Sequence, residues 1–338
     1  MNQAAQHDAP VFVTGGTGFL GRGIVRALAE RGVETHVLAR ASSDRAPLED
    51  LELTWHVGDL TDRDSLERAV AAAAAGARER GQALRVIHSG AVISYKRKDA
   101  ELQRRVNVEG TRNVLEVAAA HGVGRFVFIS SVVAVGHAPQ AGVPLDEGSP
   151  FNAGDLGVDY VDTKRAAEEL VFASDLDVVA VNPGAIFGPV SDGANTSRFL
   201  RAVLAGKGPI LAPPGGLGVV GLDDTVSGTL LALERGRTGE RYILVESYHV
   251  SVDLFRKVAR MGDARAAWGT VPRALWALVV GGARLVDRLR PLRLATPQAL
   301  VMLGKRMCFD ARKAREELGW NPRPFDEVLR ETVEHVRT

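Results

Sequence analysis

Short runs of β-branched and aliphatic residues alternate with amphipathic stretches over the first two-thirds of the chain. Seven runs have strand character: Val11–Thr14, Glu34–Leu38, Leu53–Val57, Arg85–Ser89, Arg125–Ser130, Val178–Asn182 and Arg241–Val245. Helical periodicity marks the stretches between them: Gly21–Arg31, Ser65–Arg80, Val108–His121 and Tyr160–Ala173. Several strands are apolar throughout, which is typical of strands covered on both faces. The alternation predicts an α/β protein with a Rossmann-type, doubly wound parallel sheet.

This rhythm breaks in two places. Gly136 to Gly157 is a long loop rich in Gly, Pro and Asp, of the kind that covers a site in α/β folds. After Gly184 the strands thin out, and the last third is mostly helical, basic and apolar. We therefore predict two domains. Residues 1–183, with 221–248 returning to them, form the dinucleotide-binding domain, and residues 184–220 and 249–338 form a smaller, mainly helical substrate-binding domain.

Charge and cysteine content exclude several functions. The 42 Lys and Arg residues balance 41 Asp and Glu residues, so the chain lacks the basic excess of a dedicated nucleic-acid binder. Cys308 is the only cysteine, which rules out an intrachain disulfide and a cysteine-based zinc site, and we predict no metal site. The apolar run Ala274–Ala283 is far shorter than the roughly 20 residues of a membrane span. We expect a cytoplasmic protein.

A glycine-rich turn follows the first predicted strand. Gly15, Gly18 and Gly21 are spaced three apart and lead into an amphipathic helix. In this strand–turn–helix context they allow a tight turn, a close approach to a pyrophosphate and close helix–strand packing. The helix N-terminus would supply N–H groups for the phosphates. The residues predicted to bind the dinucleotide here are Gly15, Thr17, Gly18, Phe19, Leu20 and Gly21.

The choice between the two dinucleotides depends on the residues after the second strand. An NAD-binding Rossmann fold carries a carboxylate there for the ribose hydroxyls, whereas this chain has Arg40, Ser42 and Ser43. Since a guanidinium matches a phosphate in bidentate geometry, we predict NADP(H) in preference to NAD(H), with Arg40 and the serines around the 2′-phosphate. After the third strand, Asp59 and Leu60 are expected on the adenine side.

Three side chains form a candidate catalytic set. Tyr160 and Lys164 are four residues apart, so they share one face of a helix. A nearby cation lowers the pKa of a phenol, which suits proton donation to a carbonyl as a hydride arrives. Ser131 follows the fifth strand, at the edge where ligands of open α/β sheets bind, and would hydrogen-bond the substrate oxygen.

These features together resemble the extended short-chain dehydrogenase/reductase family. The residues that carry the match are Thr14–Gly21, Gly58–Leu60, His88–Ala91, Asn107–Thr111, Ser130–Ser131, Tyr160–Lys164, Asn182–Gly184, Phe187–Pro189 and Lys313–Trp320. The resemblance implies that Tyr160 is the acid/base, that Lys164 lowers its pKa and holds the nicotinamide ribose, and that Asn107 supports the site. It also implies that Ser89, Gly90, Ala91, Pro183 and Gly184 line the cofactor, and that the protein is a homodimer. Ser89 and Gly90 depart from the family, which more often has Ala at both positions.

Within that family the chain looks like the branch of dihydroflavonol reductases and 3β-hydroxysteroid dehydrogenases. Ala39 stands where epimerases have an Asp after the second strand, and residues 216–220 before Asp223 and Asp224 lack the cation with which epimerases clamp a nucleotide. The expected substrate residues are largely apolar: Ile93, Tyr95, Val132, Val133, Ile186 and Phe187. A pocket of this kind favours a lipophilic carbonyl compound.

The leading hypothesis is therefore an NADPH-dependent reductase of a ketone or aldehyde. Two alternatives stay open: a nucleotide-sugar epimerase or dehydratase with tightly bound NAD, and a dinucleotide-sensing regulator without turnover. Residues 268–293 alternate apolar and basic side chains. They fit a solvated helix of the substrate domain better than a segment that contacts a membrane or gates the pocket.

Overall fold

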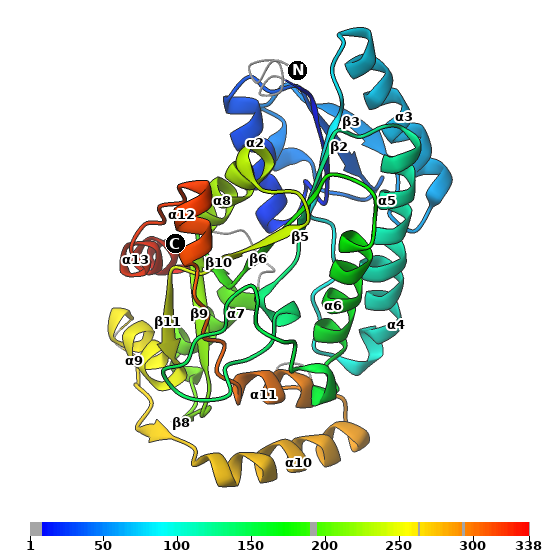
Figure 1. Ribbon diagram of the computed structural model, residues 1–338. Helices are drawn as coiled ribbons and strands as arrows, with labels where there is room; N and C mark the ends of the chain where they lie inside the picture. Colours follow the sequence, from blue (N-terminus) through cyan, green and yellow to red (C-terminus); the bar gives the residue numbers. More distant parts are fainter. Residues whose placement is uncertain (1–8, 190–194, 263, 293–294, 338) are drawn as a thin grey trace.

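One seven-stranded sheet forms the centre of the larger part of the protein (Figure 1). The structure, a computed structural model, describes residues 9–189, 195–262, 264–292 and 295–337. The strands are β1 (Val11–Thr14), β2 (Thr35–Ala39), β3 (Thr54–Val57), β4 (Arg85–His88), β5 (Arg125–Ile129), β6 (Val178–Pro183) and β10 (Glu240–Leu244). They lie in the order β10-β6-β5-β4-β1-β2-β3, and every neighbouring pair is parallel.

Helices cover both faces of this sheet (Figure 1). On one face lie α2 (Phe19–Glu30), α8 (Leu222–Arg235) and α12 (Arg312–Leu318), and on the other α3 (Arg63–Glu79), α5 (Gly110–Ala120) and α6 (Asp159–Phe172). The strands feed both layers: in β5, Val127 and Ile129 face the first, and Phe126 and Phe128 face the second. This two-sided burial is the reason why the strands are apolar throughout.

The predicted fold class is confirmed. Each of the seven predicted strands is present with its ends within one residue, and the four predicted helices are present with ends within two residues. Within residues 221–248 the chain also returns to the sheet, because β10 pairs with β6 at the edge of the sheet.

The remaining elements form a smaller lobe below the carboxyl edge of the sheet (Figure 1). Its helices are α7 (Asn195–Ala202), α9 (Ser251–Met261), α10 (Arg273–Leu289), α11 (Pro297–Leu303) and α13 (Phe325–Arg337). A further short helix, α4 (Ala100–Gln103), precedes α5 in the chain. Its strands are β7 (Ala185–Phe187), β8 (Leu211–Ala212), β9 (Gly216–Gly221), β11 (Ser247–Val250) and β12 (Gly269–Thr270), in the sheets β11-β9-β7 and β12-β8. The domain boundaries stay a prediction.

Sequence patterns did not indicate these five strands. They are two to six residues long, and β9 contains Gly216, Gly218 and Gly221, which weaken strand propensity. Close packing explains the glycines in these strands and next to them. A Cβ on Gly184 would lie 2.5 Å from the Gly218 carbonyl oxygen, and one on Gly216 would lie 2.4 Å from the Tyr248 hydroxyl.

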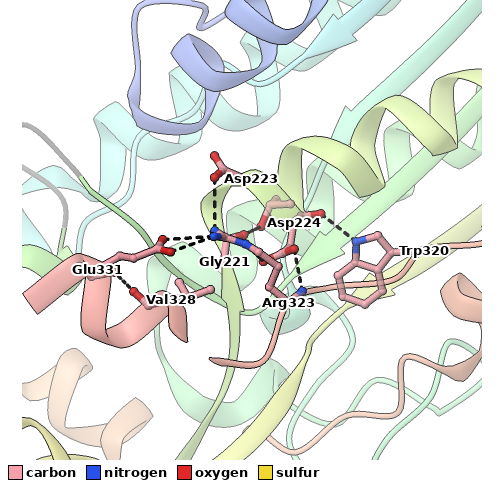
Figure 2. Close-up of polar contacts among 9 residues, drawn as sticks. Gly221, Asp223, Asp224, Trp320, Arg323, Val328 and Glu331 are labelled. Atoms are coloured by element: carbon pink, nitrogen blue, oxygen red, sulfur yellow. Dashed lines mark hydrogen bonds and ion pairs between the residues drawn. The ribbon is translucent and has the colours of Figure 1, made fainter. Parts of the chain in front are cut away.

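The C-terminal segment is fastened to the start of α8 by a cluster of polar contacts (Figure 2). The indole Nε1 of Trp320 donates to the Asp224 carbonyl oxygen at 2.8 Å, and the Asp224 carboxylate accepts the Arg323 backbone N–H at 2.9 Å. The Arg323 guanidinium lies between Asp223, at 3.3 Å, and Glu331, at 3.1 Å. Burial raises the pKa of the Asp224 carboxyl. Because α8 packs on α2, this cluster links the end of the chain to the glycine-rich turn.

Trp320 provides a test of this attachment. Its side chain is 2 % exposed, so Trp320→Phe should keep most of the packing but leave the Asp224 carbonyl without its donor. We expect a loss of about 1–2 kcal/mol in the free energy of unfolding, measured by urea denaturation. Trp268, which is 72 % exposed, is the matched control, and Trp268→Phe should change the stability by less than about 0.5 kcal/mol. Equal effects of the two substitutions would contradict this assignment.

Candidate active site

The glycine-rich turn between β1 and α2 is packed so closely that a side chain at Gly15 or Gly21 would overlap neighbouring backbone. Gly15 has a φ of 70°, and a Cβ on it would lie 2.6 Å from the Gly90 nitrogen. A Cβ on Gly21 would lie 2.0 Å from the Gly15 carbonyl oxygen. Helix α2 starts after Gly18 without a side-chain cap and without an acidic residue in its first turn. This arrangement fits a pyrophosphate, which would meet backbone N–H groups and the positive end of the helix dipole.

The close packing around Gly90 explains why this position has no Ala, the residue that the family more often has there. The residue follows β4 and lies against Gly15, and a Cβ on it would meet the Leu60 Cδ1 at 2.7 Å and the Thr14 Oγ1 at 3.3 Å. Leu60 in turn is held over Gly90 because its carbonyl oxygen accepts a hydrogen bond from Asn113 at 2.9 Å. Ser89, Gly90 and Ala91 therefore lie beside the glycine-rich turn, where the sequence places them.

The segment after β2 has the exposed cation expected there. Arg40 is exposed at the end of the strand, and the Ser43 N–H donates to its carbonyl oxygen at 3.0 Å, so Ser42 lies in a tight turn. The turn ends at Asp44, which is paired with Arg22 of α2 at 3.3 Å. Arg22 also donates to the Thr17 carbonyl oxygen at 2.8 Å. Sequence reasoning missed Arg22, although its place directly after Gly21 indicates a second cation beside the turn.

Asp59 lies at the corresponding end of β3. Burial alone would raise the pKa of its carboxyl, but hydrogen bonds from the Thr61 N–H and hydroxyl, at 2.8 and 2.7 Å, lower it. The charge of Arg40 acts in the same direction. The carboxylate of Asp59 is thus ionised and held in one orientation at the same sheet edge as the glycine-rich turn.

Ser131, Tyr160 and Lys164 come together where β5 ends beside α6. The Ser131 hydroxyl accepts the Val133 N–H at 3.4 Å and acts to lower the pKa of the Tyr160 phenol. The Lys164 ammonium donates to the Ile129 carbonyl oxygen at 2.8 Å and lies 5.0 Å from the centre of the Phe128 ring. All three candidate side chains are buried, so the structure assembles the set on one sheet edge.

The proton affinities of this set differ from the expectation. Burial raises the pKa of Tyr160 to about 12, and the Ser131 hydroxyl acts in the opposite direction. No lowering by Lys164 is seen, and its ammonium is held by the Ile129 carbonyl. Burial lowers the pKa of Lys164 itself to about 8, and the charge of Glu168 counteracts this. In the protein alone Tyr160 is therefore a neutral phenol, ready to donate a proton.

Asn107 acts on the backbone of the segment that follows β4. It lies in a π-helical turn (Arg104–Glu109), and its amide pairs with both polar groups of Val92: the oxygen accepts the N–H at 2.7 Å and the nitrogen donates to the carbonyl at 3.0 Å. The amide also donates to Thr163 at 3.2 Å, one residue from Lys164. Asn107 is thus a positioning residue that connects α6 to residues 90–95.

A buried histidine continues this connection toward the glycine-rich turn. His88 bonds with Thr14 at 2.6 Å and with Thr111 at 3.0 Å, and the Thr111 hydroxyl donates to the Asn107 carbonyl at 2.6 Å. Burial lowers the pKa of His88 to about 3, so the ring is neutral. We assign it to the structural support of β1 and β4.

A buried carboxylate beneath the catalytic set was missed by sequence reasoning. Glu168 is fully buried, one helical turn after Lys164, and accepts the Asn182 amide at 2.7 Å. The same amide donates to the Ser131 carbonyl oxygen at 3.0 Å. Arg241 of β10 pairs with Glu168 at 3.1 Å. The four-residue spacing after Lys164 was the available signal, but the partners come from two distant strands.

The expected substrate residues separate into three groups. Tyr95 packs edge-on against Tyr160, with ring centres 5.9 Å apart, and Val132 and Val133 are buried beside Ser131. Ile186 is half-buried and Ile93 is 55 % exposed. Phe187 does not lie with them: it is fully buried and packs edge-on against Phe325, so its place is in the core of the smaller lobe. Pro183 ends β6 beside β10, and the N–H of Gly184, the next residue, donates to the Leu244 carbonyl oxygen of β10 at 3.0 Å.

A cavity of about 540 Å³ lies under the loop that follows Gly136. Its walls come from residues 137–139, 155 and 156 of that loop, from α10 and from the end of α11. Four cations face it, Arg273, Arg284, Lys305 and Arg306, together with the apolar side chains of Trp276 and Val280. None of the substrate residues expected from the sequence lines this cavity, so the apolar substrate pocket stays a prediction.

A family model described as the NAD dependent epimerase/dehydratase family matches residues 11–244. The chain belongs to this family. A relative from Methylococcus capsulatus, "Sterol demethylase protein B", is 33% identical, with 92% of this chain and 93% of the relative covered. A farnesyl-dihydroquinoline-oxide ketoreductase from Stigmatella aurantiaca is 29% identical, with 91% of each chain covered. The solved structure of gox2253 is 31% identical and has a TM-score of 0.83 over 97% of this chain and 98% of that chain.

Membership of this family confirms the extended short-chain dehydrogenase/reductase resemblance. The chain is an NAD(P)-dependent enzyme of the oxidoreductase type, and the side-chain-free turn at Gly15 fits its dinucleotide. More distant relatives include a UDP-glucose 4-epimerase from Vibrio cholerae, 25% identical over 92% of this chain. The roles of the individual site residues stay predictions.

Glu168 gives a test of the electrostatics in this family member. Glu168→Gln removes the charge that raises the pKa of Lys164 while its burial remains, so we expect that pKa to fall below about 8. The ¹³Cε resonance of Lys164 in lysine-labelled protein, assigned by its loss in Lys164→Arg, measures the titration. Glu169→Gln is the matched control, because Glu169 is 59 % exposed in its side chain and should leave the pKa unchanged. An unchanged pKa in Glu168→Gln would rule out the assigned coupling.

Proposed function

We propose that this enzyme is an NADPH-dependent reductase that transfers a hydride to the carbonyl carbon of a ketone or aldehyde with an apolar body. One observation carries the proposal. The buried, neutral phenol of Tyr160 and the buried hydroxyl of Ser131 come together, so that Ser131 acts on the pKa of the phenol, and Lys164 lies one helical turn further along α6. A phenol and a hydroxyl placed together at the carboxyl edge of the sheet form a donor pair for a carbonyl oxygen.

In the proposed reaction each residue of the site has a separate role. The bound dinucleotide supplies the hydride. Ser131 and Tyr160 bind the substrate oxygen, and Tyr160 delivers its proton as negative charge develops there. Lys164 carries a positive charge below its pKa of about 8 and would stabilise the resulting phenolate. Asn107 holds the backbone of Val92, beside the expected substrate residues. Glu168 holds the Asn182 amide, which donates to the Ser131 carbonyl oxygen. Tyr95, Val132 and Val133 exclude water from the oxygen.

The preference for NADPH is supported by the charges after β2. Arg40 is exposed at the point where the adenine ribose of a Rossmann fold lies. The nearby carboxylate of Asp44 is paired with Arg22, so it does not oppose a phosphate at Arg40. Ser42 and Ser43 add hydroxyl donors in the same turn. A 2′-phosphate would find one guanidinium and two hydroxyls here.

The relatives support the reductase over the epimerase alternative. The M. capsulatus and S. aurantiaca relatives are named for sterol and ketone chemistry and are more similar to this chain than the named epimerase is. The two remaining alternatives are separable by simple measurements. Purified protein that releases tightly bound NAD on denaturation would favour the epimerase, and binding of NADPH without oxidation of any carbonyl compound would favour the regulator. The homodimer and the cytoplasmic location stay predictions.

Tyr160→Phe tests the mechanism. NADPH oxidation is first measured against a panel of aldehydes, ketones, β-keto acids and sterols, with NADH as the comparison. With the best substrate, Tyr160→Phe should lower kcat by about 100-fold or more and leave NADPH binding nearly unchanged. Tyr248→Phe, which lies on β11 away from Ser131, is the matched phenol control. Ordinary turnover by Tyr160→Phe would refute the mechanism.

Arg40→Ala tests the cofactor preference. Removal of the guanidinium should weaken NADPH binding by about tenfold or more and leave NADH binding unchanged, because only NADPH carries the 2′-phosphate. Fluorescence titration with both cofactors measures the two dissociation constants. Arg45→Ala is the control, since Arg45 stacks on Trp55 and should have no effect on the ratio. Equal affinities of the wild type for the two cofactors would contradict the preference.

A further inference from the structure

Helix α10 has an apolar stripe that faces away from the protein. The stripe consists of Leu275, Leu278, Val279, Leu285, Val286 and Leu289, whose exposed fractions are 50, 71, 41, 62, 48 and 83 %. Their spacing of three and four residues places them on one side of the helix. In Figure 1, α10 lies along the lower edge of the molecule, outside every other element.

The opposite side of α10 faces the protein. Trp276 donates to the Leu300 carbonyl of α11 at 3.1 Å, and Val280 is 8 % exposed. Trp276 and Val280 are four residues apart and line the 540 Å³ cavity. The helix is therefore held by one face while its more apolar face is left to solvent. This inverts the usual arrangement of a surface helix, which turns its apolar stripe to the core.

The apolar surface continues beyond the helix. The Trp268 side chain is 72 % exposed, and the backbone N–H of Trp268 donates to the Ile210 carbonyl oxygen at 2.9 Å. Ile210 and Leu211 are 54 and 46 % exposed. Leu211 belongs to β8, which pairs with β12 just before α10, and Ile210 directly precedes it. Nine of the fourteen large hydrophobic side chains that are exposed in the described part of the chain thus lie in these segments. Such a concentration marks a contact surface.

Positive charge surrounds this surface. Arg265 stacks on Trp268, and Arg288 and Arg290 are exposed at the other end of the helix. The one carboxylate of α10, Asp287, accepts the Leu292 N–H at 2.7 Å. Behind the helix, Arg273, Arg284, Lys305 and Arg306 face the cavity. Crowding of these cations is visible in the lowered pKa of Arg273 and Lys305, which burial causes first and the neighbouring positive charges cause next.

In place of the solvated helix that the sequence favours for residues 268–293, we propose that α10, together with Trp268, Ile210 and Leu211, docks the protein in the plane of an anionic lipid bilayer. Leucines and a tryptophan would enter the acyl boundary while the arginines at both ends meet lipid phosphates. At 17 residues α10 is too short and too charged to cross a bilayer, and none of the described helices meets the length and apolarity of a span. The helix therefore lies on the membrane rather than through it.

The charges favour a bilayer over a second copy of this chain. A two-fold contact through the stripe would place the arginines of one helix against those of the other, with Asp287 as the only carboxylate of α10 to compensate. An anionic surface instead attracts every one of them. Docking would also bring the cavity behind α10 beside the lipid, where an amphiphilic compound leaving the bilayer would enter it. The docking itself does not depend on the proposed reductase activity.

Vesicle sedimentation of the full chain tests the proposal. The probes are vesicles of phosphatidylcholine alone and of phosphatidylcholine with phosphatidylserine. We expect binding to the mixed vesicles that weakens as salt is added. Leu278→Asp/Leu285→Asp should reduce this binding by about tenfold or more, and Arg288→Gln/Arg290→Gln should reduce the preference for phosphatidylserine by about tenfold. Val57→Asp is the matched control, because Val57 is 61 % exposed on β3 at the far end of the molecule, and it should bind as the wild type does.

Each outcome decides the proposal. Circular dichroism and thermal melting should show that the variants fold, since all substituted side chains are exposed. Wild-type protein that fails to sediment with the mixed vesicles, or a leucine variant that binds equally well, would overturn it. A wild-type dimer that Leu278→Asp/Leu285→Asp converts to a monomer, without vesicle binding, would assign the stripe to a second copy and would also overturn it. These readouts use no enzyme activity, so they are independent of the reductase assay.

Discussion

The contact between Gly15 and Gly90 constrains the whole cofactor side of this protein. Two backbone segments, one after β1 and one after β4, approach so closely that a single added carbon at either position would overlap the other segment or Leu60. The approach creates a surface made only of backbone at the N-terminus of α2. Since a phosphate needs N–H groups rather than side chains there, a side chain at Gly15 would disrupt this surface, and one at Gly90 would require the Leu60 side chain to move. Neighbouring elements are arranged so as to maintain that approach.

Buried polar groups carry the constraint from the cofactor side to the catalytic side. His88 connects β1 to α5, Asn107 connects α5 to the segment after β4 and to α6, and Glu168 connects α6 to β6 and β10. Buried groups of this kind are costly when a partner is missing, so each connection tolerates little displacement. The result is that Ser131 and the Tyr160 helix are fixed relative to the sheet edge by hydrogen bonds as well as by packing.

The sequence predicted the parts of this protein that local patterns determine. The seven parallel strands, the glycine-rich turn and the Tyr160–Lys164 spacing follow from periodicity and from residues close together in the chain. The smaller lobe did not follow, because strands such as β9 are glycine-rich and owe their form to partners far away. The same holds for Glu168, whose partners Asn182 and Arg241 lie on other strands, and for Phe187, which one sheet alternation separates from Ile186 and sends into the core.

The attachment at Trp320 and Arg323 has a consequence for the order in which the protein is made. The central sheet is complete once β10 has been synthesised, so it can form while the chain is still growing. The core of the smaller lobe joins Phe187 and Val219 to Phe325 and Leu329, so it cannot close until Phe325 and Leu329 have left the ribosome. During that interval the dinucleotide site can already be formed, whereas the substrate side stays open. Binding of the dinucleotide at this stage would stabilise a half-finished protein.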